Sequence, residues 1–180
     1  MDSVTIRTEQ QGDEAAIRTV VEAAFGGPHV ADLVDALRTS PGWVPELSFV
    51  AVAGEDVVGQ VLFTRCRLDA PARLVDVLTL SPLAVHPSHQ GQGVATRLVR
   101  HGLAAAAERG VEPLVFLEGD PSFYARYDFV AAGSLGFRRP SLRIPEPAFQ
   151  VYPLPTYEDW MTGTFVYSDT FWAYDSVGLR

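Results

Sequence analysis

Gly91 and Gly93 stand one residue apart directly before a helical pattern, in the stretch HPSHQGQGVATRLVRHGL at residues 86–103. Glycine lowers helix stability, so two glycines at a helix start indicate a requirement of the backbone rather than of helix formation. A helix start presents unpaired N–H groups and a partial positive charge of about +0.5. Glycines before it let the backbone approach an anion without an intervening Cβ. The pattern therefore predicts a turn that binds phosphate.

Two familiar phosphate-binding motifs do not fit this turn. A P-loop needs a lysine, and all fourteen basic residues of the chain are arginines. A Rossmann turn needs a third glycine where Thr96 stands, and Glu118 is only a weak candidate for its acidic ribose ligand. A glycine-rich turn without any ligand stays open as the alternative.

The preceding strand, LTLSPLAVHP at residues 78–87, contains a proline. Pro82 has no N–H for a sheet ladder, so it predicts a bulge or an edge. Backbone groups of Leu83, Ala84 and Val85 would then be unpaired and open to an extended ligand with amide groups. A diphosphate joined to an amide-bearing arm suits both halves of the segment, and coenzyme A is such a ligand.

Two motifs carry a resemblance to a known family. PLAVHPSHQGQGVATRLVRHGL resembles the acetyl-CoA motif of the GNAT acyltransferase superfamily, Q/R-x-x-G-x-G/A, with Gln90, Gly93 and Ala95 in the matching positions. GDPSFYARYDF, residues 119–129, resembles the later tyrosine motif of that superfamily. Asp128 stands where the family usually has glycine, and Asp tolerates a left-handed turn. The likeness is to a bacterial subgroup of small putative acetyltransferases and covers nearly the whole chain.

The resemblance implies a fold, a co-substrate and a reaction. The fold is α/β (α+β), a single domain over residues 1–180, with a central mixed, mostly antiparallel sheet flanked by helices and a splayed strand pair that holds the cofactor. Acetyl-CoA is the implied co-substrate, and a primary amine of a small molecule or peptide accepts the acetyl group directly. The implied cofactor contacts are Leu83, Ala84, Val85, Gln90, Gly91, Gln92, Gly93, Val94, Ala95 and Thr96.

Such a reaction needs a base for the amine, a donor for the developing oxyanion and an acid for the departing thiolate. Tyr124 occupies the tyrosine position of the motif and is the expected acid, with Tyr127 packing beneath it or substituting for it. Glu118, which ends a predicted strand, is the candidate base. Glu46, Asp76 and water stay open as alternatives for the base.

Structural rather than catalytic roles are expected for most of the other reactive side chains. Cys66, the sole cysteine, is expected to be a packed thiol. His86 and His89 are interpreted as surface histidines, and no metal site is expected. Arg97 and Arg100 are expected on the polar face of the helix, where one could reach a phosphate of the cofactor. The C-terminal aromatic residues are expected in the core or at a homodimer contact, and the lining of an acceptor cleft stays open as the alternative: Trp160, Phe165, Tyr167, Phe171 and Trp172.

Hydrophobic periodicity and turn residues predict the elements that position these side chains. Asp13 is expected to cap the first helix, and Gly110 to end the helix after the glycine turn. The expected helices are residues 13–25, 29–38 and 92–109, with a short one after Asp120; the expected strands are 4–8, a hairpin over 48–69, 74–85, 113–118, 149–154 and 163–168.

Composition narrows the function. The formal net charge is −8 and the isoelectric point about 4.9, so a nucleic-acid partner is disfavoured. The sequence has no basic, apolar leader and no run long enough for a membrane span, so no membrane association and a cytoplasmic location are expected. Two alternatives stay open: a non-catalytic acyl-CoA sensor with the same fold, and a different nucleotide-binding protein.

Overall fold

The computed structural model describes residues 4–178 and divides into two compact units. The first unit comprises the chain up to Thr64 together with Ser81–Ala105, and the second comprises Arg65–Leu80 and the chain from Ala106 onward. Three elements run through both units: β3 (Asp56–Asp69), β4 (Leu74–Val85) and α3 (Val94–Arg109).

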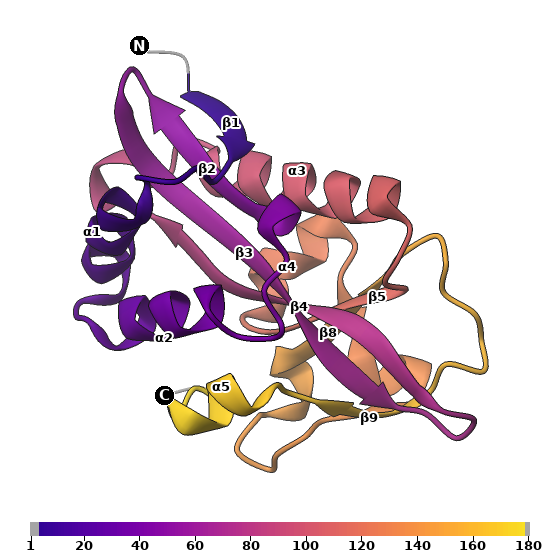
Figure 1. Cartoon of the computed structure of the whole chain (residues 1–180). Helices are drawn as coiled ribbons and strands as arrows, with labels where there is room; N and C mark the ends of the chain where they lie inside the picture. The colour runs from indigo at the N-terminus through magenta and orange to yellow at the C-terminus, as the bar shows by residue number, and fades with distance from the viewer. Residues whose placement is uncertain (1–3, 179–180) are drawn as a thin grey trace. The chain divides into compact units, whose positions relative to one another are not determined.

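The first unit is an antiparallel sheet with helices on both faces (Figure 1). Its strands β1 (Val4–Thr8) and β2 (Ser48–Ala53) pair with each other, and β2 pairs with β3. Helices α1 (Glu14–Phe25) and α2 (His29–Arg38) pack together on one side of these strands.

Helix α3 packs closely on the other face of β3. A Cβ built on Gly102 would lie 2.2 Å from the Phe63 ring, and one built on Gly59 would lie 3.0 Å from Leu98. Each glycine therefore provides the space that the facing side chain fills. This packing fixes the axis of α3, and with it the position of the turn from which the helix starts.

The second unit is built around β5 (Leu114–Glu118). This strand pairs in parallel with β4 and antiparallel with β8 (Phe149–Pro153), which in turn pairs with β6 (Val130–Ala131). A second set of strands joins β3 to β9 (Gly163–Val166) and β9 to β7 (Phe137–Arg138). The short helices are α4 (Pro121–Tyr124) and α5 (Asp169–Ala173).

Aromatic rings form the core of this second unit. The Phe116 ring lies 5.1 Å from Phe137, 5.5 Å from Phe149 and 4.6 Å from Phe165, measured between centroids. Phe165 in turn contacts Tyr167 at 4.7 Å. These rings hold β5, β7, β8 and β9 together through side chains on one face of the sheet.

Most predicted elements are confirmed, and the differences have local causes. Helix α3 begins at Val94 rather than Gln92, because Gly91 and Gly93 have φ values of 73° and 79°, outside the right-handed helical region. Asp13 precedes α1, but its side chain pairs with Arg7 at 2.6 Å instead of capping the helix. The sequence did not predict β6, β7 or α5, which are short.

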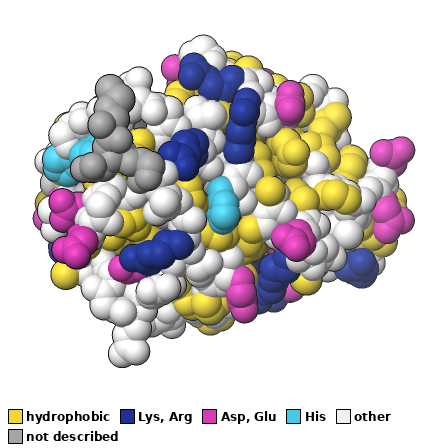
Figure 2. Space-filling model, turned by 90° about the horizontal axis from the view of Figure 1, so that it is seen from above, with side chains coloured by type: hydrophobic (Ala, Val, Ile, Leu, Met, Phe, Trp, Pro, Cys, Tyr) yellow, Lys and Arg dark blue, Asp and Glu magenta, His cyan; other side chains and the backbone are white. Residues whose placement is uncertain are grey.

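Arginine and acidic side chains are both spread over the face drawn in Figure 2, with apolar and neutral side chains between them. The net negative charge of the chain is therefore not gathered into one block on this face. None of the described helices combines the length and the apolar character needed to cross a membrane.

Candidate functional site

The turn before α3 exposes bare backbone. Gly91 and Gly93 both have positive φ, and a Cβ built on either would meet no atom within 4 Å. The first helical hydrogen bond runs from the Arg97 N–H to the Gly93 carbonyl at 3.1 Å. The Cβ positions of both glycines therefore face open space directly before a helix start, which is the kind of turn that can bind an anion.

Two glutamine side chains donate hydrogen bonds to backbone carbonyls of this segment. Gln90 Nε2 donates to the Val85 carbonyl at 2.9 Å, and Gln92 Nε2 donates to the Ser88 carbonyl at 3.0 Å. The His86 N–H donates to the Val58 carbonyl of β3 at 2.9 Å, which ties the turn to the sheet. These two glutamines hold the shape of the turn through their side-chain amides.

The strand before the turn differs in part from expectation. Strand β4 pairs in parallel with β5 at Leu78 and Thr79. The expectation that the backbone of Val85 is unpaired is wrong, because its carbonyl accepts from Gln90. Leu83 is half-buried, whereas Ala84 and Val85 are buried.

The remaining residues near the turn lie in the first two turns of α3 and in the loop before it. Val94 is buried and Ala95 and Thr96 are half-buried in the first turn of α3, with Arg97 and Arg100 exposed. His86 and His89 each lie within hydrogen-bond distance of the Ser88 hydroxyl, at 2.7 and 2.9 Å. Within residues 4–178, no three His, Cys, Asp or Glu side chains are gathered in a way that could hold a metal ion.

Tyr124 is positioned by a capped helix start. The Asp120 side chain accepts from the Ser122 N–H at 2.8 Å, which starts α4. A Cβ on Gly119 would lie 2.4 Å from the Tyr124 ring, so only glycine lets the ring pack there. Burial raises the pKa of Tyr124 to about 12, and the neighbouring Tyr127 adds to the shift. The phenol is therefore protonated at neutral pH, the state that a general acid needs.

Glu118 lies at the end of β5 and is held by two groups from the C-terminal segment. The Tyr167 hydroxyl donates to Glu118 Oε1 at 2.8 Å, and the Gly178 N–H donates to Oε2 at 3.1 Å. Burial raises the pKa of Glu118, while these hydrogen bonds and the charge of Arg143 act in the opposite direction. Sequence reasoning missed both partners, because the contact with Tyr167 spans 49 residues and no local pattern marks it.

Glu118 and Tyr124 leave the end of β5 on opposite faces. Glu118 pairs across the sheet with Phe149, whose ring lies in the aromatic core. The next residue, Gly119, extends the strand pairing, because its N–H donates to the Ala148 carbonyl. A Cβ on Gly119 would therefore point to the face opposite Glu118, and the Tyr124 ring lies on that face. Two titratable groups thus flank the end of β5, one on each face of the sheet.

The other two carboxylates considered for the base are ion-paired or exposed. Asp76 is engaged by Arg67 and Arg65. Glu46 is exposed in a short 3-10 turn at Pro45–Leu47. Cys66 is buried, and burial raises the pKa of its thiol to about 12, so the expected packed thiol is confirmed.

A family model described as an acetyltransferase (GNAT) domain matches residues 5–132. The chain belongs to the GNAT acetyltransferase family. The family, the enzyme class and the mixed, mostly antiparallel sheet flanked by helices, all predicted from the sequence, are confirmed.

Bacterial relatives agree with this assignment. YjhQ of Escherichia coli K12, named an uncharacterized N-acetyltransferase, is 34% identical over 156 residues, which cover 84% of this chain and 77% of YjhQ. The structure of YhbS from Escherichia coli in complex with CoA has a TM-score of 0.83 at 29% identity and covers 95% of this chain and 93% of that one. A GNAT acetyltransferase from Brucella melitensis in complex with acetyl-CoA has a TM-score of 0.75 at 28% identity, covering 95% and 99%.

Replacing Gly93 by alanine places a methyl group over the bare N–H groups of the turn. The left-handed conformation costs an L-residue about 1–2 kcal/mol. Gly54, with φ 61° and equally open surroundings in the β2–β3 turn, provides a matched control. We expect Gly93→Ala and Gly54→Ala to lose similar free energies of unfolding in urea.

The two variants should differ in their response to an anion. Millimolar inorganic pyrophosphate is expected to raise the melting temperature of the wild type and of Gly54→Ala, and to leave that of Gly93→Ala unchanged. Equal stabilisation of all three proteins would contradict the assignment of the anion to this turn.

Proposed function

We propose that this protein transfers the acetyl group of acetyl-CoA to a primary amine of a small molecule or peptide. The observation that carries the proposal is the bare turn at Gly91 and Gly93, in a chain of the GNAT family. Two similar structures, solved with CoA and with acetyl-CoA, support the choice of co-substrate. Acetylation of an amine panel, followed by the release of free thiol, tests the proposal.

The turn fits the diphosphate of the co-substrate. The open space above Gly91 and Gly93 admits a phosphate where any Cβ would intrude, and the start of α3 supplies N–H donors. Gln90 and Gln92 keep the turn in this shape in the absence of a ligand. The free-energy cost of ordering the backbone is therefore met during folding rather than on binding.

The reaction moves one acetyl group and one proton. A C–N bond forms to the acceptor amine, the C–S bond breaks, the amine loses a proton and the thiolate gains one. In the proposal, Glu118 accepts the proton of the amine and Tyr124 donates to the thiolate. The protonation states fit these roles, because burial keeps the phenol of Tyr124 protonated and makes the carboxylate of Glu118 more basic than usual.

The sensor alternative makes a different prediction for the same residues. A protein that only binds acyl-CoA has no use for two titratable groups at one strand end. Perturbed pKa values at a site of this kind favour catalysis over binding alone. Stabilisation by CoA without thiol release on any amine would support the sensor instead.

Tyr124→Phe should reduce kcat by about 10²-fold, because general acid catalysis of this kind contributes on that order. The ring contacts with Phe123 and Phe129 are retained in this variant, so the fold and the KM for acetyl-CoA should change little. Tyr127→Phe, which changes the neighbouring ring in the same way, should keep near-wild-type kcat. An equal kcat for Tyr124→Phe and the wild type would show that Tyr124 is not the general acid.

The pH dependence of kcat/KM tests the role of Glu118. A base must be ionised to act, so activity should fall as the pH falls through the raised pKa of Glu118. This acidic limb should lie above the range of an ordinary glutamate and should disappear in Glu118→Gln.

Tyr167→Phe is the control, because it removes the donor that lowers the pKa of Glu118 while keeping the carboxylate. The acidic limb should then move to higher pH. An acidic limb that is unchanged in both variants would assign the base elsewhere.

A further inference from the structure

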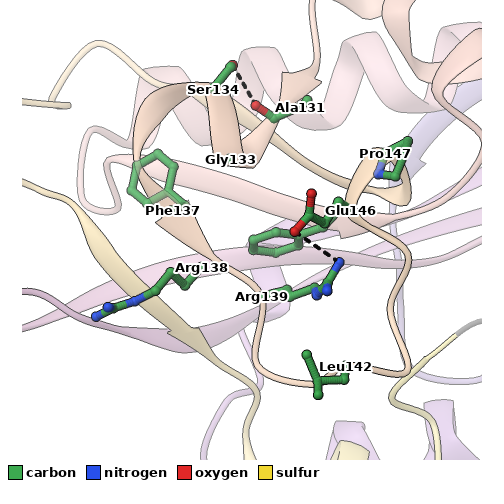
Figure 3. Close-up of a pocket in the computed structure, with 10 residues that line it drawn as sticks. Ala131, Gly133, Ser134, Phe137, Arg138, Arg139, Leu142, Glu146 and Pro147 are labelled. Atoms are coloured by element: carbon green, nitrogen blue, oxygen red, sulfur yellow. Dashed lines mark hydrogen bonds and ion pairs between the residues drawn. The ribbon is translucent and has the colours of Figure 1, made fainter.

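The second unit contains a cavity of about 740 Å³ next to its aromatic core (Figure 3). Phe137 and Phe149, each 3% exposed, form its apolar wall, and Leu142 and Pro147 extend this wall toward solvent. Arg138, Arg139 and Glu146 add charge at its edge. A predominantly apolar cavity with a few charged groups is the usual form of a small-molecule site.

Residues 129–145, which provide part of the cavity lining beside the acidic Glu146, are rich in arginine. Residues 129–145 contain no acidic residue, although the chain has 22, and three of its fourteen arginines lie there: Arg138, Arg139 and Arg143. Arg143 pairs with Asp175 at 3.0 Å, and Arg138 Nε donates to the Thr164 hydroxyl at 3.1 Å. These two arginines are thus engaged with the protein.

Arg139 is held less firmly. Its guanidinium lies 3.6 Å from Glu146, whose side chain is 83% exposed (Figure 3). An ion pair of this length with a solvated carboxylate is weak. Arg139 itself is only 23% exposed, so its donors lie at the cavity rather than in bulk solvent. A planar anion such as a carboxylate can take two of these donors at once.

The cavity adjoins the candidate base. Phe149 pairs directly with Glu118 across β5 and β8, and side chains of such a pair project from the same face of the sheet. Phe116, two residues before Glu118, stacks on Phe149 on that face. An apolar group seated against Phe149 therefore lies one strand away from Glu118.

We propose that this cavity selects the acceptor: a primary amine that carries an apolar, ring-sized body and a carboxylate. Phe137 and Phe149 contact the body, Arg139 binds the carboxylate, and the amine is left toward Glu118. This inference rests on the proposed function, because the ligand of the cavity is an acceptor only if the protein transfers acetyl groups. The carboxylate of the ligand is assigned to Arg139, because the ion pair of this arginine with Glu146 is weak.

A binding measurement tests the cavity without requiring turnover. The probe is 3-phenylpropionate, which has the ring and the carboxylate but no amine, and its neutral analogue is 3-phenylpropanamide. Calorimetry on the full chain should show that the acid binds more tightly than the amide. Arg139→Gln should weaken binding of the acid about 10-fold, as loss of a charged hydrogen bond predicts.

Arg73→Gln is the matched control, because Arg73 also belongs to the second unit and contacts the Trp160 ring at 5.1 Å. It should leave binding of the acid unchanged. Equal binding of acid and amide, or an equal loss in the two arginine variants, would overturn the proposed site.

Turnover assays separate this proposal from the proposed function. With phenylalanine and phenylalaninamide as acceptors, the wild type should favour the carboxylate, and Arg139→Gln should lose this preference at an unchanged KM for acetyl-CoA. A raised KM for acetyl-CoA in Arg139→Gln would assign the cavity to the co-substrate and overturn the inference. Arg139-dependent binding of 3-phenylpropionate without turnover of any amine would support the cavity as a site and contradict acetyl transfer.

Discussion

Binding of the co-substrate, as proposed, depends on one stretch of backbone that no side chain covers at its two glycines. Gly91 and Gly93 adopt left-handed conformations, and no protein atom lies where their Cβ atoms would be. Folding normally covers backbone N–H groups with hydrogen bonds, and a helix start is where they are left over. Here the space beside Gly91 and Gly93 is open, so a ligand with negative charge can approach the start of the helix.

The rest of the first unit serves to keep this turn open. Gly102 and Gly59 let α3 approach β3 closely, so the helix start is fixed relative to the sheet. Gln90 and Gln92 donate their side-chain amides to the carbonyls of Val85 and Ser88 in the same segment.

In the second unit, packed aromatic rings position the carboxylate of Glu118. Rings around Phe116 hold four strands together, and the same cluster leads through Phe165 to Tyr167, whose hydroxyl reaches Glu118. The carboxylate is therefore placed by residues from the C-terminal part of the chain. This arrangement explains why burial raises its pKa even though the strand end is partly open.

Features that depend on neighbouring residues in the chain were predicted correctly from the sequence. The periodicity of residues 94–106, the glycines with positive φ and the Asp120 cap are short-range features, and the structure reproduces them. The start of α3 was misplaced by two residues, because periodicity alone does not register a left-handed glycine.

Contacts between residues that are far apart in the chain could not be predicted from the sequence. Tyr167 and Gly178 reach Glu118 across 49 and 60 residues, and the Phe137–Phe149 cavity forms only when β7 and β8 join the same aromatic core. The glycine motif carried the functional prediction because its chemistry is that of one contiguous segment. The acceptor side depends on tertiary packing and had no comparable local signal.

Backbone amide chemical shifts of the labelled protein, titrated separately with adenosine 3′,5′-bisphosphate, with pantetheine and with coenzyme A, test the uncovered turn most directly. The account predicts large shifts at Gly91, Gly93, Val94 and Ala95 with coenzyme A, which carries the diphosphate, and none at these positions with pantetheine. Shifts with coenzyme A that leave these four amides unchanged and cluster elsewhere in the protein would contradict it.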